Sequence, residues 1–73
     1  MTREENKHFF ADVRLGLNMN LGPFCDRNMI YRSEFSNFMK DQYNHIPDEK
    51  LDAMREDIIN HIEEFMKIYK KVA

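Results

Sequence analysis

The sequence predicts a small all-α domain built from four helices, the last of them long. Apolar residues recur three and four positions apart in several stretches, which is typical of amphipathic helices. No stretch alternates apolar and polar residues as a half-buried strand would. A length of 73 residues allows a single domain, 1–73, and 42% hydrophobic with 33% charged residues is typical of a folded chain.

The first helix is predicted to start behind Thr2 and to extend to about Leu17. Thr2 and Glu5 have the spacing of a capping box, in which each side chain bonds the backbone N–H of the other residue. The apolar positions that follow recur at helical spacing, at Phe9, Phe10, Val13 and Leu17. Residues 18–20 are then expected to form a connection.

Two short helices are predicted next, over Leu21–Asn28 and Arg32–Lys40, with a tight turn over residues 28–31. Asn20 has the side chain of an N-cap for the first of them. Pro23 falls in the first turn of that helix, where its missing N–H does no harm. A loop over residues 41–45 is expected after the second.

The last helix is predicted over residues 47–72, with Pro47 at its first position and lysines near its C-terminus. Its apolar stripe consists of Leu51, Met54, Ile58, Ile62, Phe65, Tyr69 and Val72. A helix of about 25 residues is roughly 38 Å long, which is more than the three shorter helices can cover. We therefore expect a homodimer, with an interface formed by Ile58, Ile62, Phe65, Met66 and Tyr69. The alternative is that this end folds back over the first helix.

The sequence offers no pattern of catalytic or metal-ligating residues. Cys25 is the only cysteine, so it forms no disulfide within the chain and indicates a reducing, cytoplasmic compartment. The three histidines lack the spacing of a zinc site. No nucleophile–base pair or glycine-rich phosphate loop occurs, so we expect neither an enzyme nor a cofactor. A charged N-terminus and no apolar run of roughly 18 residues predict neither an export signal nor a membrane span.

Residues 19–40 have the pattern of a helix-turn-helix. Two short helices that cross at a steep angle need a small residue at the crossing, and Cys25 occupies that position. Ile30 follows five residues later, where an apolar side chain must fill the turn. Phe35, and then Phe38 with Met39, provide the apolar positions of the second helix. The remaining positions of that helix are polar or amphipathic and are expected to face outward.

From about Ala11 to Ile62 the chain resembles the Cro and lambda-repressor-like helix-turn-helix domains, also called the xenobiotic-response-element family. The segments that carry the resemblance are VRLGLNMNLGPFC, IYRSEFSNFMK and IPDEKLDAMREDI. The chain departs from the family at Met29, where glycine is common at the start of the turn; a turn shifted by one residue would give the left-handed conformation to Asn28. Cys25 stands where the family usually has alanine, and Leu21 stands where it often has glutamine. The family's domains also end in two short helices, whereas this sequence predicts one long helix.

The resemblance implies a small DNA-binding transcriptional regulator of phage or mobile-element type, which represses by occupying a promoter. Its recognition helix would enter the major groove of duplex DNA by its N-terminal end. The residues nearest the bases would be Arg32, Ser33, Ser36 and Asn37, with Tyr31 at the phosphate margin. Further contacts to phosphates are expected from Arg14, Arg27 and Lys40.

The distribution of charge leaves a second function open. The net charge is −2, and residues 46–64 carry seven acids against Lys50 and Arg55, so no broad basic patch is evident. An acidic surface of this kind could imitate a phosphate backbone and engage a protein partner. The alternative is therefore a protein-interaction module, such as an antirepressor or an inhibitor of a nucleic-acid-binding protein. A helical bundle that only imitates the helix-turn-helix pattern is the third interpretation.

Overall fold

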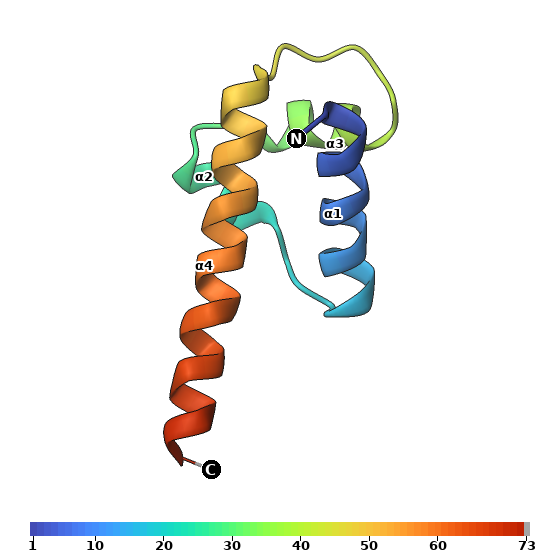
Figure 1. Ribbon diagram of the computed structural model, residues 1–73. Helices are drawn as coiled ribbons and strands as arrows, with labels where there is room; N and C mark the ends of the chain where they lie inside the picture. The colour runs from blue at the N-terminus through green and yellow to red at the C-terminus, as the bar shows by residue number, and fades with distance from the viewer. Residues whose placement is uncertain (73) are drawn as a thin grey trace.

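The chain folds into four α-helices in a computed structural model, which describes the backbone of residues 1–72 and the side chains of residues 1–70. The helices are α1 (Arg3–Gly16), α2 (Gly22–Arg27), α3 (Arg32–Met39) and α4 (Asp48–Val72) (Figure 1). No strand occurs within residues 1–72. The predicted all-α class, with four helices and a long last one, is confirmed.

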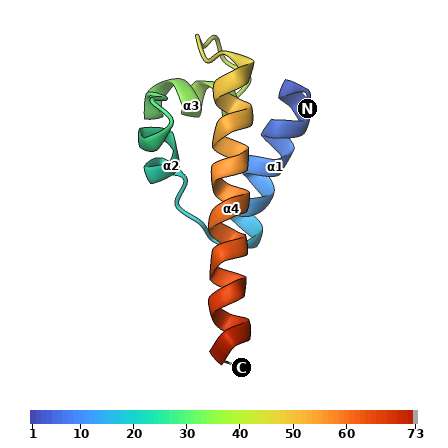
Figure 2. The same ribbon diagram turned by 60° about the vertical axis from the view of Figure 1, so that its left-hand side comes forward.

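The long helix α4 is the axis along which the other elements are arranged. Helices α1 and α2 both pack against its first half, and α3 packs against α1 and α2 (Figures 1 and 2). The second half of α4 continues past the ends of the other helices, which gives the molecule an elongated shape of 45 × 21 × 21 Å. The predicted excess length of the last helix is therefore present in the structure.

The start of α1 confirms the predicted capping box, whereas the start of α2 differs from the prediction. Thr2 Oγ1 accepts from the backbone N–H of Glu5 at 3.1 Å, and Thr2 N donates to Glu5 Oε1 at 3.0 Å. Leu21, rather than Asn20, occupies the N-cap position of α2. The Asn20 side chain precedes the N-cap residue but still accepts from Gly22 N at 3.1 Å. It therefore satisfies the first backbone N–H of α2.

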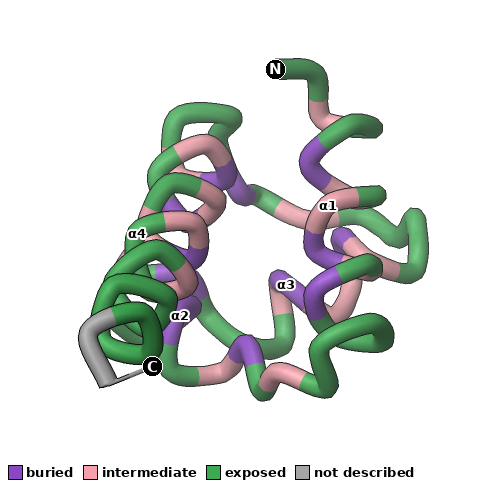
Figure 3. The backbone as a smooth tube through the Cα atoms, turned by 60° about the horizontal axis from the view of Figure 1, so that its bottom comes forward, coloured by how far each residue is buried: buried purple, intermediate pink, exposed green. Residues whose placement is uncertain are grey.

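The core is formed by the inward faces of all four helices together with the segments between them (Figure 3). Aromatic rings connect α1 to α3, with ring centroids 5.3 Å apart for Phe10 and Phe35 and 6.3 Å apart for Phe10 and Phe38. Both pairs have the edge-to-face geometry that aromatic quadrupoles favour. The buried apolar residues are Phe10, Val13, Leu21, Phe24, Cys25, Ile30, Phe35, Phe38, Ile46, Leu51, Met54 and Ile58.

The position of Ile58 corrects one predicted interface residue. Its side chain is 0% exposed within the single chain, because the first half of α4 turns this face toward α1 and α2. The prediction that Ile58 lies between two copies is therefore wrong. Ile62, one turn further on, is half-buried against the same core, and the exposed part of the stripe begins after it.

A buried polar side chain, Asn6, joins α1 to α4. Its amide is 1% exposed; its Nδ2 donates to Asp52 Oδ1 at 2.8 Å and its Oδ1 accepts from Arg55 Nε at 2.9 Å. A buried amide that loses its partners costs about 1–3 kcal/mol. The hydrogen bonds of Asn6 therefore fix the register of α1 against α4, a role that the sequence pattern did not indicate.

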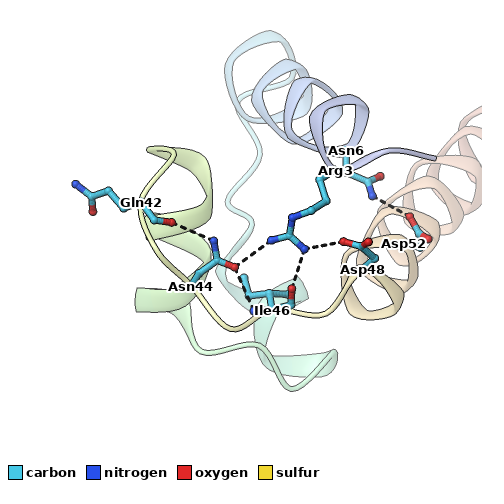
Figure 4. Close-up of polar contacts among 7 residues, drawn as sticks. All are labelled: Arg3, Asn6, Gln42, Asn44, Ile46, Asp48 and Asp52. Carbon is cyan, nitrogen blue, oxygen red and sulfur yellow. Dashed lines mark hydrogen bonds and ion pairs between the residues drawn. The ribbon is translucent and has the colours of Figure 1, made fainter.

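Arg3 fixes the connection between α3 and α4 (Figure 4). Its Nη1 donates to the backbone oxygen of Ile46 at 2.9 Å and to Asp48 Oδ1 at 2.6 Å, and its Nη2 donates to Asn44 Oδ1 at 3.1 Å. The guanidinium also lies 5.2 Å from the centroid of the Phe38 ring. A single side chain of α1 thus holds the loop and the first residue of α4 against the end of α3.

Replacing Asn6 with alanine should lower the free energy of unfolding by about 2 kcal/mol, because Asp52 and Arg55 lose their buried partner. Urea denaturation followed by circular dichroism measures this change. The matched control is Asn60→Ala at an exposed position of α4, which should change stability by less than about 0.5 kcal/mol. Equal effects of the two substitutions would contradict the role given to Asn6.

Candidate nucleic-acid interface

The helices α2 and α3 form a unit that is closed by three buried side chains. Cys25 on α2, Ile30 in the turn and Phe35 on α3 are 1%, 4% and 7% exposed and belong to the same core. The backbone N–H of Ile30 donates to the oxygen of Cys25 at 2.9 Å, which fixes the turn to the end of α2. The prediction that these three positions are apolar and buried is confirmed.

The turn takes the left-handed conformation at Met29, not at Asn28. Met29 has φ of 55°, whereas Asn28 has φ of −98°. The alternative of a turn shifted by one residue is therefore wrong. The Asn28 side chain caps α2, because its Nδ2 donates to the backbone oxygen of Phe24 at 2.8 Å. The same Nδ2 donates to Asp57 Oδ2 at 3.1 Å, so Asn28 also connects the turn to α4.

One face of α3 remains outside the core and carries six of the predicted site residues. Its helical positions, 32, 33, 36, 37 and 40, recur at the spacing of a single helix face. Tyr31 precedes them at the N-cap position and is 81% exposed. The six residues that the structure brings together are Tyr31, Arg32, Ser33, Ser36, Asn37 and Lys40; Ser36 and Asn37 are half-buried and the other four are exposed. We call this surface the α3 face.

Arg32 is held in place by an ion pair within the α2–α3 unit. Its Nε donates to Asp26 Oδ1 at 3.1 Å and its Nη2 donates to Asp26 Oδ2 at 2.7 Å, a two-point geometry. The hydrogen bonds from Arg32 lower the pKa of the Asp26 carboxyl. The guanidinium lies over Gly22, where an added Cβ would come within 2.6 Å of Arg32 Cζ. Arg32 is therefore oriented on the α3 face, but its charge is balanced by Asp26.

The other two predicted arginines do not belong to the α3 face. Arg27 turns toward α4, where its Nε and Nη2 donate to the Asp57 carboxylate at 3.1 and 3.0 Å and its guanidinium lies over Phe24. Arg14 lies in the last turn of α1, the end of that helix remote from α3 (Figures 1 and 2). The structure therefore places neither arginine on the α3 face, and their expected contacts to phosphates stay a prediction.

Lys50 is a cation at the α3 face that sequence reasoning missed. Its Nζ donates to the backbone oxygen of Met29 at 2.8 Å. Together with Tyr31, Arg32 and three other residues it lines an open hollow at the start of α3. Lys50 lies within the acidic stretch of the sequence, and no local pattern indicates that α4 would bring it to the turn.

Most of the acids of residues 46–64 form ion pairs within the chain. Five of the seven form ion pairs with basic side chains of the same molecule, and the two without one among residues 1–70 are Glu49 and Glu63. The five paired acids are Asp48, Asp52, Glu56, Asp57 and Glu64. This pairing weakens the case for an acidic surface that imitates a phosphate backbone.

Cys25 has the environment of a packing residue. Its side chain is buried at the α2–α3 crossing, and burial raises the pKa of the thiol to about 11. A thiol with this pKa is protonated near neutral pH, and the thiolate is the reactive form of cysteine. The geometry therefore gives Cys25 a role in helix packing.

Comparisons with known proteins add no family assignment to this geometry. No protein-family model, curated protein or solved structure matches the chain. Within the described residues, no group of three or more histidine, cysteine, aspartate or glutamate side chains is placed to hold a metal ion. None of the described helices combines the length and the apolar character that crossing a membrane requires. The α3 face is therefore interpreted from its own chemistry.

Replacing Met29 with glycine should raise the free energy of unfolding by about 1 kcal/mol. A left-handed conformation costs a non-glycine residue roughly 1–2 kcal/mol, and the Met29 side chain is 77% exposed, so little packing is lost. Urea denaturation of this variant and of the control Met29→Ala measures the difference. If the alanine variant is stabilised as much as the glycine variant, the backbone explanation is wrong.

The Arg27–Asp57 pair should make stability depend on acid pH. The hydrogen bonds from Arg27, and then from Asn28, lower the pKa of Asp57 below its ordinary value of 3.8. Because the folded pKa is the lower one, this contribution is complete well above pH 3.8 and is lost as the pH falls through the folded pKa. Asp57→Asn should therefore cost about 0.5–1 kcal/mol at pH 7, and less at pH 3, in urea denaturation. The control Asn60→Ala, at an exposed residue of α4 whose side chain does not titrate, should have the same effect at both pH values.

Proposed function

We propose that this chain binds duplex DNA through the α3 face and regulates transcription by occupying a promoter. One observation carries the proposal: Cys25, Ile30 and Phe35 close the α2–turn–α3 unit, and this closure leaves a continuous polar face of α3 outside the core. A helix presented in this way can enter the major groove, which is wide enough to admit an α-helix.

The side chains of the α3 face have the chemistry of base recognition. The Arg32 guanidinium can donate two hydrogen bonds to a guanine, and the Asn37 amide can both donate to and accept from an adenine. The hydroxyl groups of Ser33 and Ser36 can donate or accept. Of these four residues, Arg32 is the one that should contribute most to sequence preference.

The charges of the chain predict an affinity for DNA that falls steeply as the salt concentration rises. The chain carries a net charge of −2, and the α3 face has no broad basic surround. Lys40 on the α3 face and Lys50 beside Tyr31 and Arg32 are available for phosphate contacts, while Arg32 must exchange Asp26 for a base. We therefore expect modest affinity at physiological salt and a logarithmic salt slope near −0.9 for each phosphate contact.

The protein-interaction alternative receives less support. It relied on the acidic surface of residues 46–64, and most of those carboxylates are engaged by basic side chains of the chain itself. Basic groups of a partner protein would compete with these internal cations for the same carboxylates.

The direct test selects duplexes from a random pool with the purified protein and measures binding of the enriched sequence by fluorescence anisotropy. Arg32→Ala should weaken binding to that sequence by about 1–3 kcal/mol and relax the preference at one base position. Lys67→Ala is the matched control, because it removes one positive charge from the far end of α4. Failure to bind any duplex at about 50 mM salt would refute the proposal.

Releasing Arg32 from its internal partner should strengthen DNA binding. Asp26→Asn removes the competing carboxylate, and because exposed ion pairs are weak, affinity should rise by at most about fivefold. The control Asp12→Asn makes the same change in charge on an exposed part of α1. If both variants gain equally, Arg32 is not the group being released.

A further inference from the structure

A small hollow of about 270 Å³ opens between the turn after α2, the start of α3 and the first turn of α4. Ile30 and Ile46 belong to the core and line this hollow, so that part of its wall is fixed by packing. Met29, Tyr31 and Pro47 extend the apolar wall toward solvent. The volume lies just below the roughly 300–1,000 Å³ of most ligand pockets, so the hollow suits a small molecule.

Lys50 lines the small hollow and is a half-buried cation without an acidic partner among residues 1–70. Its Nζ donates to the backbone oxygen of Met29 at 2.8 Å, which fixes its position and leaves further donors of the ammonium free. The other half-buried bases of the described chain, Arg3, Lys7 and Arg55, each form an ion pair with an aspartate. Lys50 is therefore the exception among them.

Glu34 lines the same hollow and is the corresponding exception among the acids. It is half-buried, and its Oε2 accepts from the backbone N–H of His45 at 2.9 Å, which leaves the other carboxylate oxygen available. No base of residues 1–70 forms an ion pair with it. The other half-buried acids in that range, Asp52 and Asp57, are paired with arginines. His45, which is exposed, is the third titratable side chain of the hollow.

The two unpaired charges therefore lie in one hollow, and they form no ion pair with each other. A charge that is partly withdrawn from water is unfavourable unless it has a partner. A ligand with only an anionic group would leave Glu34 unpaired, and a ligand with only a cationic group would leave Lys50 unpaired. The ligand that satisfies both carries both charges, and the apolar wall requires that it also have an apolar part.

We propose that the small hollow binds a free α-amino acid with an apolar side chain. Near neutral pH such a molecule carries one carboxylate and one ammonium group. Its carboxylate accepts from Lys50 Nζ, its ammonium donates to Glu34, and its side chain lies against the apolar wall of the hollow. The bound molecule thereby connects α3 to α4. This proposal does not rest on the binding of DNA by the α3 face.

The first test uses the unmodified chain and isothermal titration calorimetry with leucine, methionine and phenylalanine. At least one of them should bind saturably, one molecule per chain, with Kd at or below about 1 mM. The matched ligands are 4-methylpentanoate, which is leucine without its ammonium group, and 3-methylbutylamine, which is leucine without its carboxylate. If leucine binds, each should bind at least about tenfold more weakly, because each loses one charge-assisted hydrogen bond. No saturable binding of the three amino acids up to about 10 mM, or equal affinities for leucine and 4-methylpentanoate, would overturn the proposal.

The second test assigns the two contacts. Glu34→Gln keeps an acceptor for the His45 N–H but loses the charge, so this variant should bind leucine no better than the unmodified chain binds 4-methylpentanoate. Lys50→Met should likewise bind leucine no better than the unmodified chain binds 3-methylbutylamine. Glu63→Gln and Lys70→Met make the same changes at exposed positions of α4 and should leave the affinity for leucine unchanged. Full leucine affinity in either hollow variant, with native circular dichroism, would contradict the assigned contact.

Discussion

The amide of Asn6 sets how α1 lies on α4, and the positions of the other two helices follow from that pair. Its donor and its acceptor are both satisfied, by Asp52 and Arg55. A shift of α1 along α4 would leave the amide and two ionised groups without these partners, at a cost on the order of several kcal/mol. Because α3 packs on α1 and α2 packs on α4, this junction also determines where the α3 face points.

Features formed by residues close together in the sequence could be predicted, because they require particular residue types three or four positions apart. The capping box at Thr2 and the apolar stripe of α4 both follow from intervals of three or four residues. The three positions that close the α2–turn–α3 unit were also predictable, since a crossing of short helices demands apolar side chains at fixed offsets. The same reasoning placed six polar residues on the outward side of α3.

Contacts between distant segments could not be predicted from spacing. Arg27 has the sequence context of any surface arginine, and its partner Asp57 lies 30 residues further along the chain. Lys50 looked like one base among acids until the fold brought it to the turn at Met29. Ile58 and Phe65 belong to the same apolar stripe of α4. Ile58 is buried because α1 and α2 cover that part of the helix, and Phe65 is exposed because they do not reach it.

The second half of α4, which packs against no other helix, also affects how the chain unfolds locally. Beyond Ile62 the helix has no tertiary packing among the described side chains, and isolated helices shorter than about 12–15 residues are marginal in water. The backbone amides after Ile62 should therefore exchange with solvent far faster than those of the first half of α4, which are exposed only when the packed helices unfold. We therefore expect the cooperative folding unit of this protein to end within α4, near Ile62, so that the turns after Ile62 fray without unfolding the packed helices.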